Sequence, residues 1–232
     1  MSALPVTDFA TRLVDAARPA DVTQNPFVLR LREGISPDSL KRYGIATYAI
    51  ASGFPRVLSS VLAECDEPRV RHSLIGNLLE EEGVTTYVPA KGVTVVPERG
   101  HGSLGRRFAR ATGATDAELA AAPFVRPRWF TQALRDGNWL GPFAYFAVGQ
   151  EANVPPLYRT LIPLFRERYG LSDEALEFLS EHVTADDRHG LEAAMMIADV
   201  ARTEEARKQA LEGARRGGRA WWELHRAHAR EA

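Results

Sequence analysis

The chain has 232 residues, with 29 lysines and arginines against 30 aspartates and glutamates, so its formal net charge at pH 7 is −1. This balance argues against nucleic acid or an anionic membrane surface as the main partner. Apolar residues make up 45% and charged residues 25% of the chain, a composition typical of a soluble globular protein. We expect a single domain over residues 1–232.

The cysteine content and the N-terminal segment indicate a cellular compartment. Cys65 is the only cysteine, which excludes an internal disulfide and a cysteine-based zinc cluster. The first residues lack a basic segment ahead of an apolar one, so no secretory signal is predicted. No stretch approaches the roughly 20 apolar residues that span a bilayer. We therefore expect a cytoplasmic protein without a membrane partner.

Most of the sequence has apolar residues at a helical period, interrupted by proline and glycine, and this pattern predicts an all-α bundle of about seven helices. Ser36 and Pro37 are typical of a helix start, and the helix that follows is expected to bend near Pro55. The expected helices lie over residues 7–18, 37–48, 66–83, 104–112, 127–135, 140–152, 156–169 and 172–199, with a final helix carrying Trp221 and Trp222.

Residues 84–96 break the helical pattern. Two runs rich in β-branched residues, VTTYV and VTVV, are separated by the turn-forming tetrapeptide PAKG. We expect a small β-hairpin inserted into a helical protein. Its role is left open between a lid over a site and a surface insertion.

Three ionisable side chains interrupt the apolar face of the helix expected over residues 172–199. At about 100° per residue, His182, Asp186 and His189 fall in the middle of this face. A metal ion would compensate their burial directly, because two imidazoles and a carboxylate can converge from successive turns. A solvated face or a His–Asp pair is the alternative. The apolar residues of the face are Ala175, Phe178, Leu179, Ala193, Met196, Ile197 and Val200.

Glutamates supply further candidates. Glu151 is the only charged residue between Asp136 and Arg159, which favours a functional carboxylate, although an exposed helix end is the alternative. In the run Glu80–Glu82, helical phase favours Glu82, tolerates Glu81 and rejects Glu80. The alternative for this run is a solvated helix end. His101 lies between two glycines and, taken alone, suits the surface or a helix cap.

These residues occur within motifs that belong together. The segments NLLEEEG, HGSLGRRFARATG, QEANVP and EHVTADDRHG follow one another along the chain. In this order the chain resembles the haem-oxygenase-like di-iron oxidases, relatives of pyrroloquinoline-quinone synthase and thiaminase II. The resemblance covers nearly the whole chain and implies a haem-oxygenase-like helical bundle. It also implies a ligand set for two metal ions, made of Glu81, His101, Glu151, His182, Asp186 and His189.

The resemblance implies a non-haem di-iron enzyme with two Fe(II) ions, or manganese and iron, and O2 as cosubstrate. The expected substrate is a small amine or amino-acid-like molecule, which would undergo N-oxygenation or oxidative C–C cleavage in specialised metabolite biosynthesis. The sequence does not identify the electron donor. A metal-free haem-oxygenase-like binding or regulatory protein, a di-iron fatty-acid decarboxylase and a zinc hydrolase are the alternatives.

Two structural roles are also expected. Trp221 and Trp222 could pack the last helix across the bundle or against a second subunit, which leaves a homodimer open. Tyr48, Phe146 and Arg159 border the segments of the resemblance, and we expect them to pack in the core.

Overall fold

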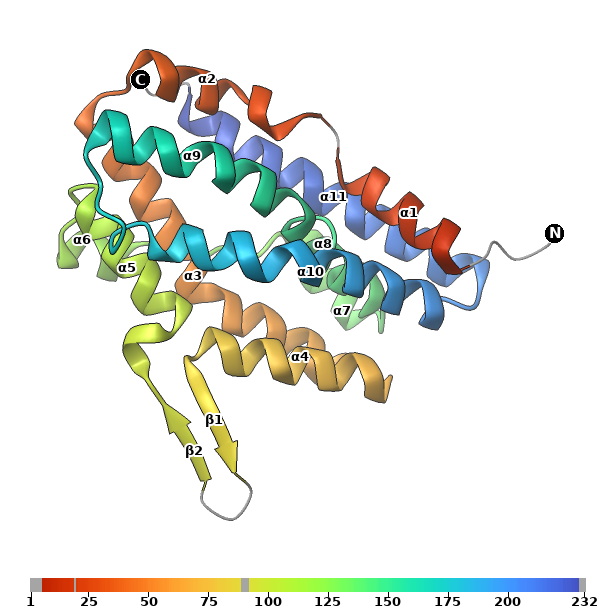
Figure 1. Cartoon of the computed structure of the whole chain (residues 1–232). Coiled ribbons are helices and arrows are strands. Elements are labelled where there is room, and N and C mark those ends of the chain that lie inside the picture. The colour runs from red at the N-terminus through yellow and green to blue at the C-terminus, as the bar shows by residue number, and fades with distance from the viewer. Residues whose placement is uncertain (1–5, 19, 89–91, 230–232) are drawn as a thin grey trace. The chain divides into compact units, whose positions relative to one another are not determined.

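A computed structural model describes residues 6–18, 20–88 and 92–229, with the side chains of residues 85–88, 92–93 and 185–188 left out. The described chain is helical except for one two-stranded sheet, as expected (Figure 1). Its α-helices are labelled α1 to α11, against about seven expected for the bundle. Nine of them correspond to the helical segments expected from the sequence, and two short helices are additional.

The chain divides into two compact units. The first comprises Met1–Gly34, Pro127–Arg168 and Leu179–Ala232, and the second comprises Ile35–Arg126 and Tyr169–Phe178. The expectation of a single domain stays a prediction.

The elements of the first unit are α1 (Val6–Ala17), η1 (Val22–Gln24), α2 (Pro26–Glu33), α7 (Arg128–Arg135), α8 (Leu140–Ala147), η3 (Glu151–Asn153), α9 (Val154–Tyr169), most of α10 (Glu177–Val200) and α11 (Glu204–His228).

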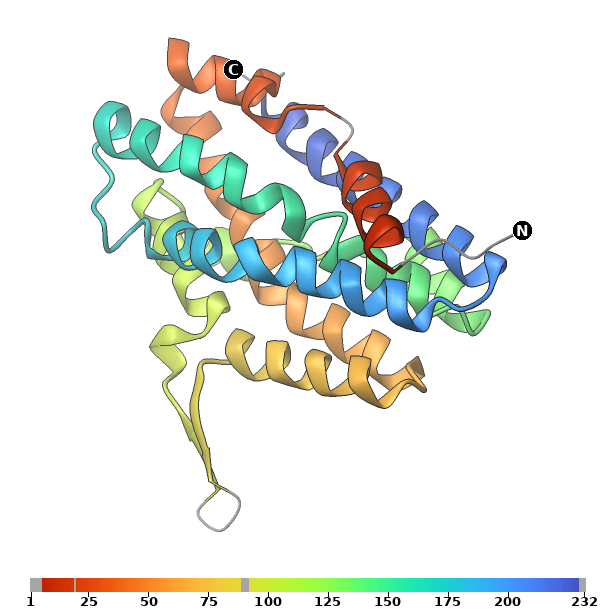
Figure 2. The same ribbon diagram turned by 45° about the vertical axis from the view of Figure 1, so that its right-hand side comes forward.

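Helix α11 organises the first unit, because it contacts α1, α2 and α8. Figure 2 shows α11, in blue, lying alongside α1, in red. Glycines allow backbones to approach closely here: a Cβ added to Gly213 would lie 2.1 Å from the carbonyl oxygen of Gly141, and one added to Gly217 would lie 1.9 Å from that of Tyr145. Only glycine fits at these positions of α11, because any side chain would overlap the backbone of α8.

The second unit is built around one long helix. Its elements are α3 (Pro37–Glu64), α4 (Pro68–Glu81), β1 (Val84–Val88), β2 (Gly92–Val95), η2 (Pro97–Arg99), α5 (His101–Ala111) and α6 (Asp116–Ala121). The Ser36 hydroxyl accepts a hydrogen bond from the Ser39 amide and Pro37 takes the first helical position, as the sequence predicts. Helix α3 continues through Pro55 to Glu64 and packs against α4, α5 and α6.

By length and apolar composition alone, α3 is the one helix of the described residues that could cross a membrane. Core helices pass the same test, and α3 buries side chains such as Tyr43, Leu58 and Val61 among its neighbours. The expected absence of a membrane partner stays a prediction, as does the cytoplasmic location.

The expected β-hairpin is confirmed. Strands β1 and β2 are antiparallel, with Val84 opposite Val95 and Val88 opposite Gly92, and a register shift lies between Val84 and Thr86. The loop residues 89–91 lie outside the described part of the chain. A role as a lid stays a prediction.

Some expected boundaries were wrong. Helix α8 ends at Ala147 instead of reaching residue 152, because Gly149 packs against the backbone of α11, where a Cβ would lie 2.6 Å from the Gly217 Cα. Two short helices were not expected. Helix α2 begins after Asn25, which caps it, and α6 begins with a capping box between Thr115 and Glu118. Both caps could have been read from the sequence.

Candidate functional site

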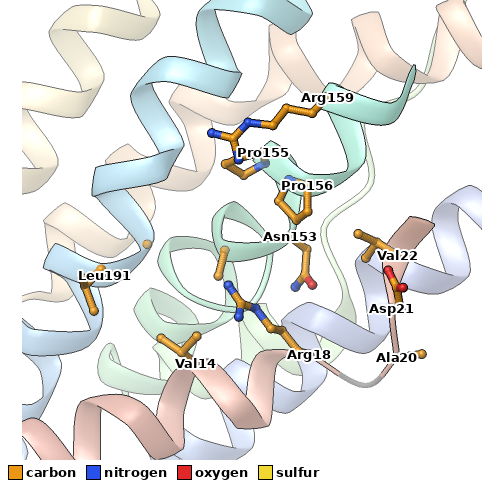
Figure 3. A pocket seen from close by; sticks show the side chains of 12 residues that line it. Val14, Arg18, Ala20, Asp21, Val22, Asn153, Pro155, Pro156, Arg159 and Leu191 are labelled. Carbon is orange, nitrogen blue, oxygen red and sulfur yellow. The ribbon is translucent and has the colours of Figure 1, made fainter. Parts of the chain in front are cut away.

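A pocket of about 490 Å³ lies in the first unit, and Figure 3 shows the side chains that line it. Arg159 lines this pocket and is exposed, so the expectation that it packs in the core was wrong. Phe146 is buried, as expected. Two of the lining residues directly follow candidate ligands in the sequence: Ala152 follows Glu151, and Gly190 follows His189.

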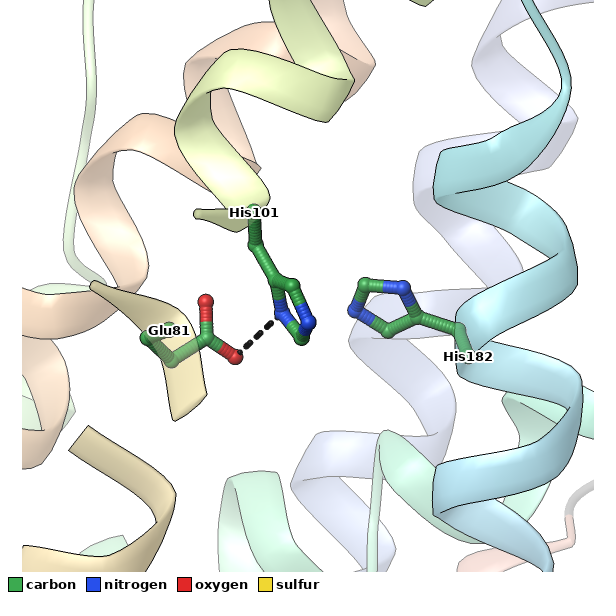
Figure 4. Close-up of side chains that lie close together, drawn as sticks. All are labelled: Glu81, His101 and His182. Atoms are coloured by element: carbon green, nitrogen blue, oxygen red, sulfur yellow. Dashed lines mark ion pairs between the residues drawn. The ribbon is translucent and has the colours of Figure 1, made fainter. Parts of the chain in front are cut away.

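In the second unit, the structure brings Glu81 and His101 together. The Glu81 Oε1 atom lies 2.8 Å from the His101 Nδ1 atom (Figure 4). The Glu81 side chain is 5% exposed and that of His101 is 15% exposed, so the pair is largely withdrawn from water. Carboxylate and imidazole are both donors for iron and manganese, and burial of such a pair is costly without a partner for each group.

The hairpin explains how His101 reaches Glu81 from a distant position in the sequence. Gly83 ends the turn after α4 with φ +72°, and its carbonyl oxygen accepts a hydrogen bond from the Val96 amide, 2.9 Å away. The chain that leaves at Gly83 therefore returns to the same point after β2. Gly100 then packs against the end of α4, where an added Cβ would lie 3.2 Å from the Glu81 carbonyl oxygen.

The structure distinguishes the three neighbouring glutamates. Glu81 is buried, whereas Glu80 and Glu82 are exposed. The preference of helical phase for Glu82 was wrong, because Glu82 lies at the C-cap of α4, beyond the last full turn. The resemblance, which selects Glu81, is the reading that agrees with this burial.

His101 is the first residue of α5, so this helix begins earlier than the expected residue 104, and His101 is not its N-cap. The ring of His101 meets the ring of Phe178 edge to face, with centroids 6.2 Å apart. Arg107, further along α5, forms ion pairs with Glu174 and Glu177. The Phe178 contact limits the rotation of the His101 ring, and the Arg107 ion pairs hold α5 against the start of α10.

In the first unit, Glu151 begins the 3-10 turn η3 and is 7% exposed. All eight residues of α8 are buried ahead of it. The alternative of an exposed helix end was therefore wrong for Glu151. A carboxylate in such apolar surroundings needs compensation by a cation or by hydrogen bonds.

Helix α10 carries the remaining candidates, and Figure 4 shows His182 on it. The His182 ring meets the Tyr158 ring edge to face, with centroids 6.2 Å apart. His189 is two turns further along and partly buried. The backbone of Asp186 belongs to α10, but its side chain lies outside the described residues. The apolar face expected around these residues is buried at Ala175, Phe178, Leu179, Ala193 and Ile197.

The chemistry of the donor set fits iron. Among the described candidates, Glu81 and Glu151 are buried carboxylates, and the histidines are at most partly exposed. None of the candidates is a thiol, and the lone Cys65 is buried beside Glu67 on another part of the chain. Carboxylates with imidazoles suit iron or manganese better than structural zinc.

Comparison with solved structures identifies the fold class. A TenA homolog from Pseudomonas syringae pv. tomato superposes with a TM-score of 0.71 at 14% identity, covering 100% of this chain and 98% of that chain. A domain with a haem-oxygenase-like fold from Shewanella denitrificans gives a TM-score of 0.66 at 15% identity, covering 99% and 94%. A CADD-like protein of unknown function from Nostoc punctiforme gives 0.67 at 17% identity, covering 98% of both chains. The fold is all-α and haem-oxygenase-like.

The family follows from the sequence. Residues 41–222 match the family described as iron-containing redox enzymes, and the chain belongs to this family. It is therefore an oxidoreductase, and the expected resemblance is confirmed.

Curated relatives are named 4-aminobenzoate synthase. The protein from Chlamydia muridarum is 25% identical over 195 residues, covering 78% of this chain and 74% of the relative. That from Nitrosomonas europaea is 26% identical over 217 residues, covering 87% and 82%.

Proposed function

We propose that this oxidoreductase uses two iron ions, or manganese and iron, together with O2 to oxidise a small amine or amino-acid-like substrate. The reaction would be N-oxygenation or oxidative C–C cleavage, in the biosynthesis of a specialised metabolite. In this proposal the metal ligands are Glu81, His101, Glu151, His182, Asp186 and His189.

The buried pair of Glu81 and His101 carries the metal part of the proposal. It lies where the resemblance puts two ligands, and the adjacent glutamates are exposed. A largely buried carboxylate and imidazole whose polar atoms lie 2.8 Å apart support a metal site at this position, because both groups are donors for iron. Membership of an iron-containing redox family supports iron as the metal.

Bound iron would supply the electrons and the open coordination positions that activation of O2 needs. The chain supplies the surroundings. Glu81 and Glu151 would offset cationic charge from buried positions, and the residues of α8 exclude water near Glu151. Tyr158 packs edge to face on His182 and limits the rotation of that imidazole.

The relatives support the substrate class. Their name, 4-aminobenzoate synthase, describes a product that carries both an amine and a carboxylate. This chemistry favours a small polar substrate over the long aliphatic chain of a fatty acid.

Anaerobic loading with Fe(II), followed by measurement of iron per chain, tests the metal site. We expect about two irons per chain in the natural protein and a loss of most of the iron in Glu81→Gln and His182→Ala. Two exposed residues give matched controls: Glu82→Gln changes the neighbouring glutamate, and His72→Ala removes a histidine of α4. Both controls should load normally. Normal loading of Glu81→Gln and His182→Ala would contradict the ligand assignment.

O2 consumption by the loaded protein tests the reaction. Amino acids and small amines should stimulate O2 uptake above the substrate-free rate, whereas fatty acids should not. Stimulation by fatty acids alone would favour a decarboxylase, and turnover with Zn(II) in the absence of O2 would favour a hydrolase. Either result would overturn the proposed reaction. A protein that binds no iron and consumes no O2 with any of these compounds would support a metal-free role.

A further inference from the structure

Arg107 lies on α5 and contacts two other segments of the second unit. Its Nη1 atom donates hydrogen bonds to the Glu177 carboxylate and, at 3.4 Å, to the Glu174 carbonyl oxygen. Its Nη2 atom donates to the Glu98 carbonyl oxygen, also at 3.4 Å. Glu98 belongs to η2, before α5, whereas Glu174 and Glu177 lie just before and at the start of α10. One guanidinium group therefore joins two segments that are far apart in the sequence.

Both segments flank the proposed ligand His101. Glu98 comes three residues before His101 in the chain. Glu177 directly precedes Phe178, whose ring meets the His101 ring edge to face, with centroids 6.2 Å apart and an angle of 88° between the ring planes. The contacts of Arg107 therefore hold the backbone that leads into His101 and also the residue next to the aromatic ring that packs on its imidazole.

Gly105 allows Phe178 to lie close to α5. A Cβ added to Gly105 would be 3.9 Å from the Phe178 Cδ2 atom and 2.8 Å from the Ala51 Cβ atom on α3. His101 and Gly105 are four residues apart, so they share one face of α5. Phe178, which is 3% exposed, therefore covers the first turn of this helix. Its position depends on the start of α10, which Arg107 holds.

The ion pair of Arg107 and Glu177 contributes little to the stability of the fold by itself. The side chain of Arg107 is 31% exposed and that of Glu177 is 37% exposed, and ion pairs at such positions are weak in water. The three acceptors of Arg107 lie on different residues, which suits a planar guanidinium group better than the single ammonium group of lysine. This arrangement predicts a residue whose loss affects unfolding little and the orientation of His101 more.

We propose that Arg107 is a positioning residue for the metal site: by holding Glu98 and Glu177 it fixes the His101 imidazole between Glu81 and Phe178. The inference rests on the proposed function, because His101 is a metal ligand only in that proposal. The charge of Arg107 would act in the opposite sense. A guanidinium group near a bound cation repels it, so the loss of charge alone would strengthen iron binding.

Anaerobic titration of the full chain with Fe(II), in competition with a chelator, tests the inference. We expect about tenfold weaker iron binding in Arg107→Gln and in Arg107→Lys, which keeps the charge, while the Tm of each falls by no more than about 4 °C. Arg110→Gln is the matched control, because it removes an ion pair with Asp116 from the same helix. Natural affinity in both Arg107 variants, an equal loss in Arg110→Gln, or a larger fall in Tm would overturn the proposal.

Glu177→Ala removes the same contact from its other side. If Arg107 acts through Glu177, the double variant Arg107→Gln/Glu177→Ala should bind iron about as weakly as Arg107→Gln alone. Losses that add up in the double variant would show that the two residues act independently, and would contradict this contact as the cause.

NMR spectra of the metal-free protein measure the position of His101 directly. The ring current of Phe178 shifts the imidazole signals of His101, which are identified by their absence in His101→Gln. We expect these signals to move toward those of an unfolded chain in Arg107→Gln and to stay in place in Arg110→Gln. Unmoved signals in Arg107→Gln would overturn the positioning role. Failure of the natural protein to bind iron would instead contradict the proposed function, whatever the NMR result.

Discussion

His225 on α11 is a buried histidine outside the proposed metal site. It is 2% exposed, and its Nδ1 atom lies 2.9 Å from the Trp221 carbonyl oxygen, to which it donates. Its ring lies 4.6 Å from that of Trp221, measured between centroids. Burial lowers the pKa of His225 to about 4, the bond to Trp221 opposes this shift, and the charge of His228 adds to it. The imidazole is therefore neutral at pH 7.

The lowered pKa of His225 makes the stability of the protein depend on pH. The unfolded chain binds a proton at this residue below about pH 6.5, whereas the folded chain resists it until about pH 4. The stabilisation is complete above pH 6.5 and is lost as the pH falls toward 4. We expect this residue to remove about 2 kcal/mol from the free energy of unfolding between about pH 7 and about pH 5.

Urea unfolding at both pH values, compared between the natural protein and His225→Leu, measures this contribution. The comparison cancels the carboxylates that titrate in the same range. An identical pH slope in the two proteins would show that His225 is not buried in its neutral form. His72→Leu, at an exposed position, serves as the control.

At the residue scale, the sequence predicted some residues of the candidate site and missed others. The face of His182 and His189 could be read from periodicity because α10 is a long regular helix. Glu81 could not, because helical phase fails at a helix end, and its choice came from the resemblance. Arg18 and Asn153 were missed, since the pocket forms where three separate segments meet and no local pattern marks it.

At the scale of elements, the contact between α8 and α11 depends on glycine. Gly217→Ala would place a Cβ 1.9 Å from the Tyr145 carbonyl oxygen, so α8 and α11 would have to separate. We expect the free energy of unfolding to fall by about 3 kcal/mol or more, because backbone groups cannot move aside as side chains do. Thermal and urea unfolding followed by circular dichroism measure the loss.

Gly76 on α4 provides the matched control. It lies inside a helix, and an added Cβ would meet nothing within 4 Å. Gly76→Ala should raise the free energy of unfolding by about 1 kcal/mol, because alanine loses less backbone entropy in a helix than glycine. Equal effects of the two substitutions would mean that helix propensity, and not the close contact, determines the result.

Elements were predicted well where a cap and a regular period coincide, as at Ser36 and Pro37 before α3. They were predicted poorly where contacts with a distant helix decide. The end of α8 is set by Gly149 against Gly217, residues far apart in sequence, so the apolar run up to Ala152 was mistaken for a continuous helix. The hairpin was predicted correctly because β-branched runs flank a strong turn signal.

At the scale of the whole molecule, metal binding should be visible as stability. A ligand that binds only the folded state adds about 2.7 kcal/mol at a concentration 100 times its dissociation constant. For a chain of this length that corresponds to a rise in Tm of roughly 5–10 °C. We expect anaerobic Fe(II) to produce such a rise in the natural protein and in His72→Ala, but not in His182→Ala. An equal rise in all three, measured by differential scanning calorimetry, would point to iron bound elsewhere.

The class of the whole fold was accessible from sequence because helical periodicity extends over most of the chain and its motifs occur in one order. The number of helices and the division into two compact units were not, because both depend on contacts between distant segments. No local motif identifies the substrate either. Its proposed class is therefore based on the relatives, and the O2-uptake experiment tests it.

The glycine contact also has a practical consequence for engineering. Random mutagenesis aimed at new substrates would lose many variants at Gly213 and Gly217, where every replacement adds atoms to a space already filled by another backbone. We expect the exposed arginines that line the pocket to tolerate exchange far better. A library that keeps α11 constant and diversifies Arg18 and Arg159 would therefore yield a larger share of folded proteins to screen.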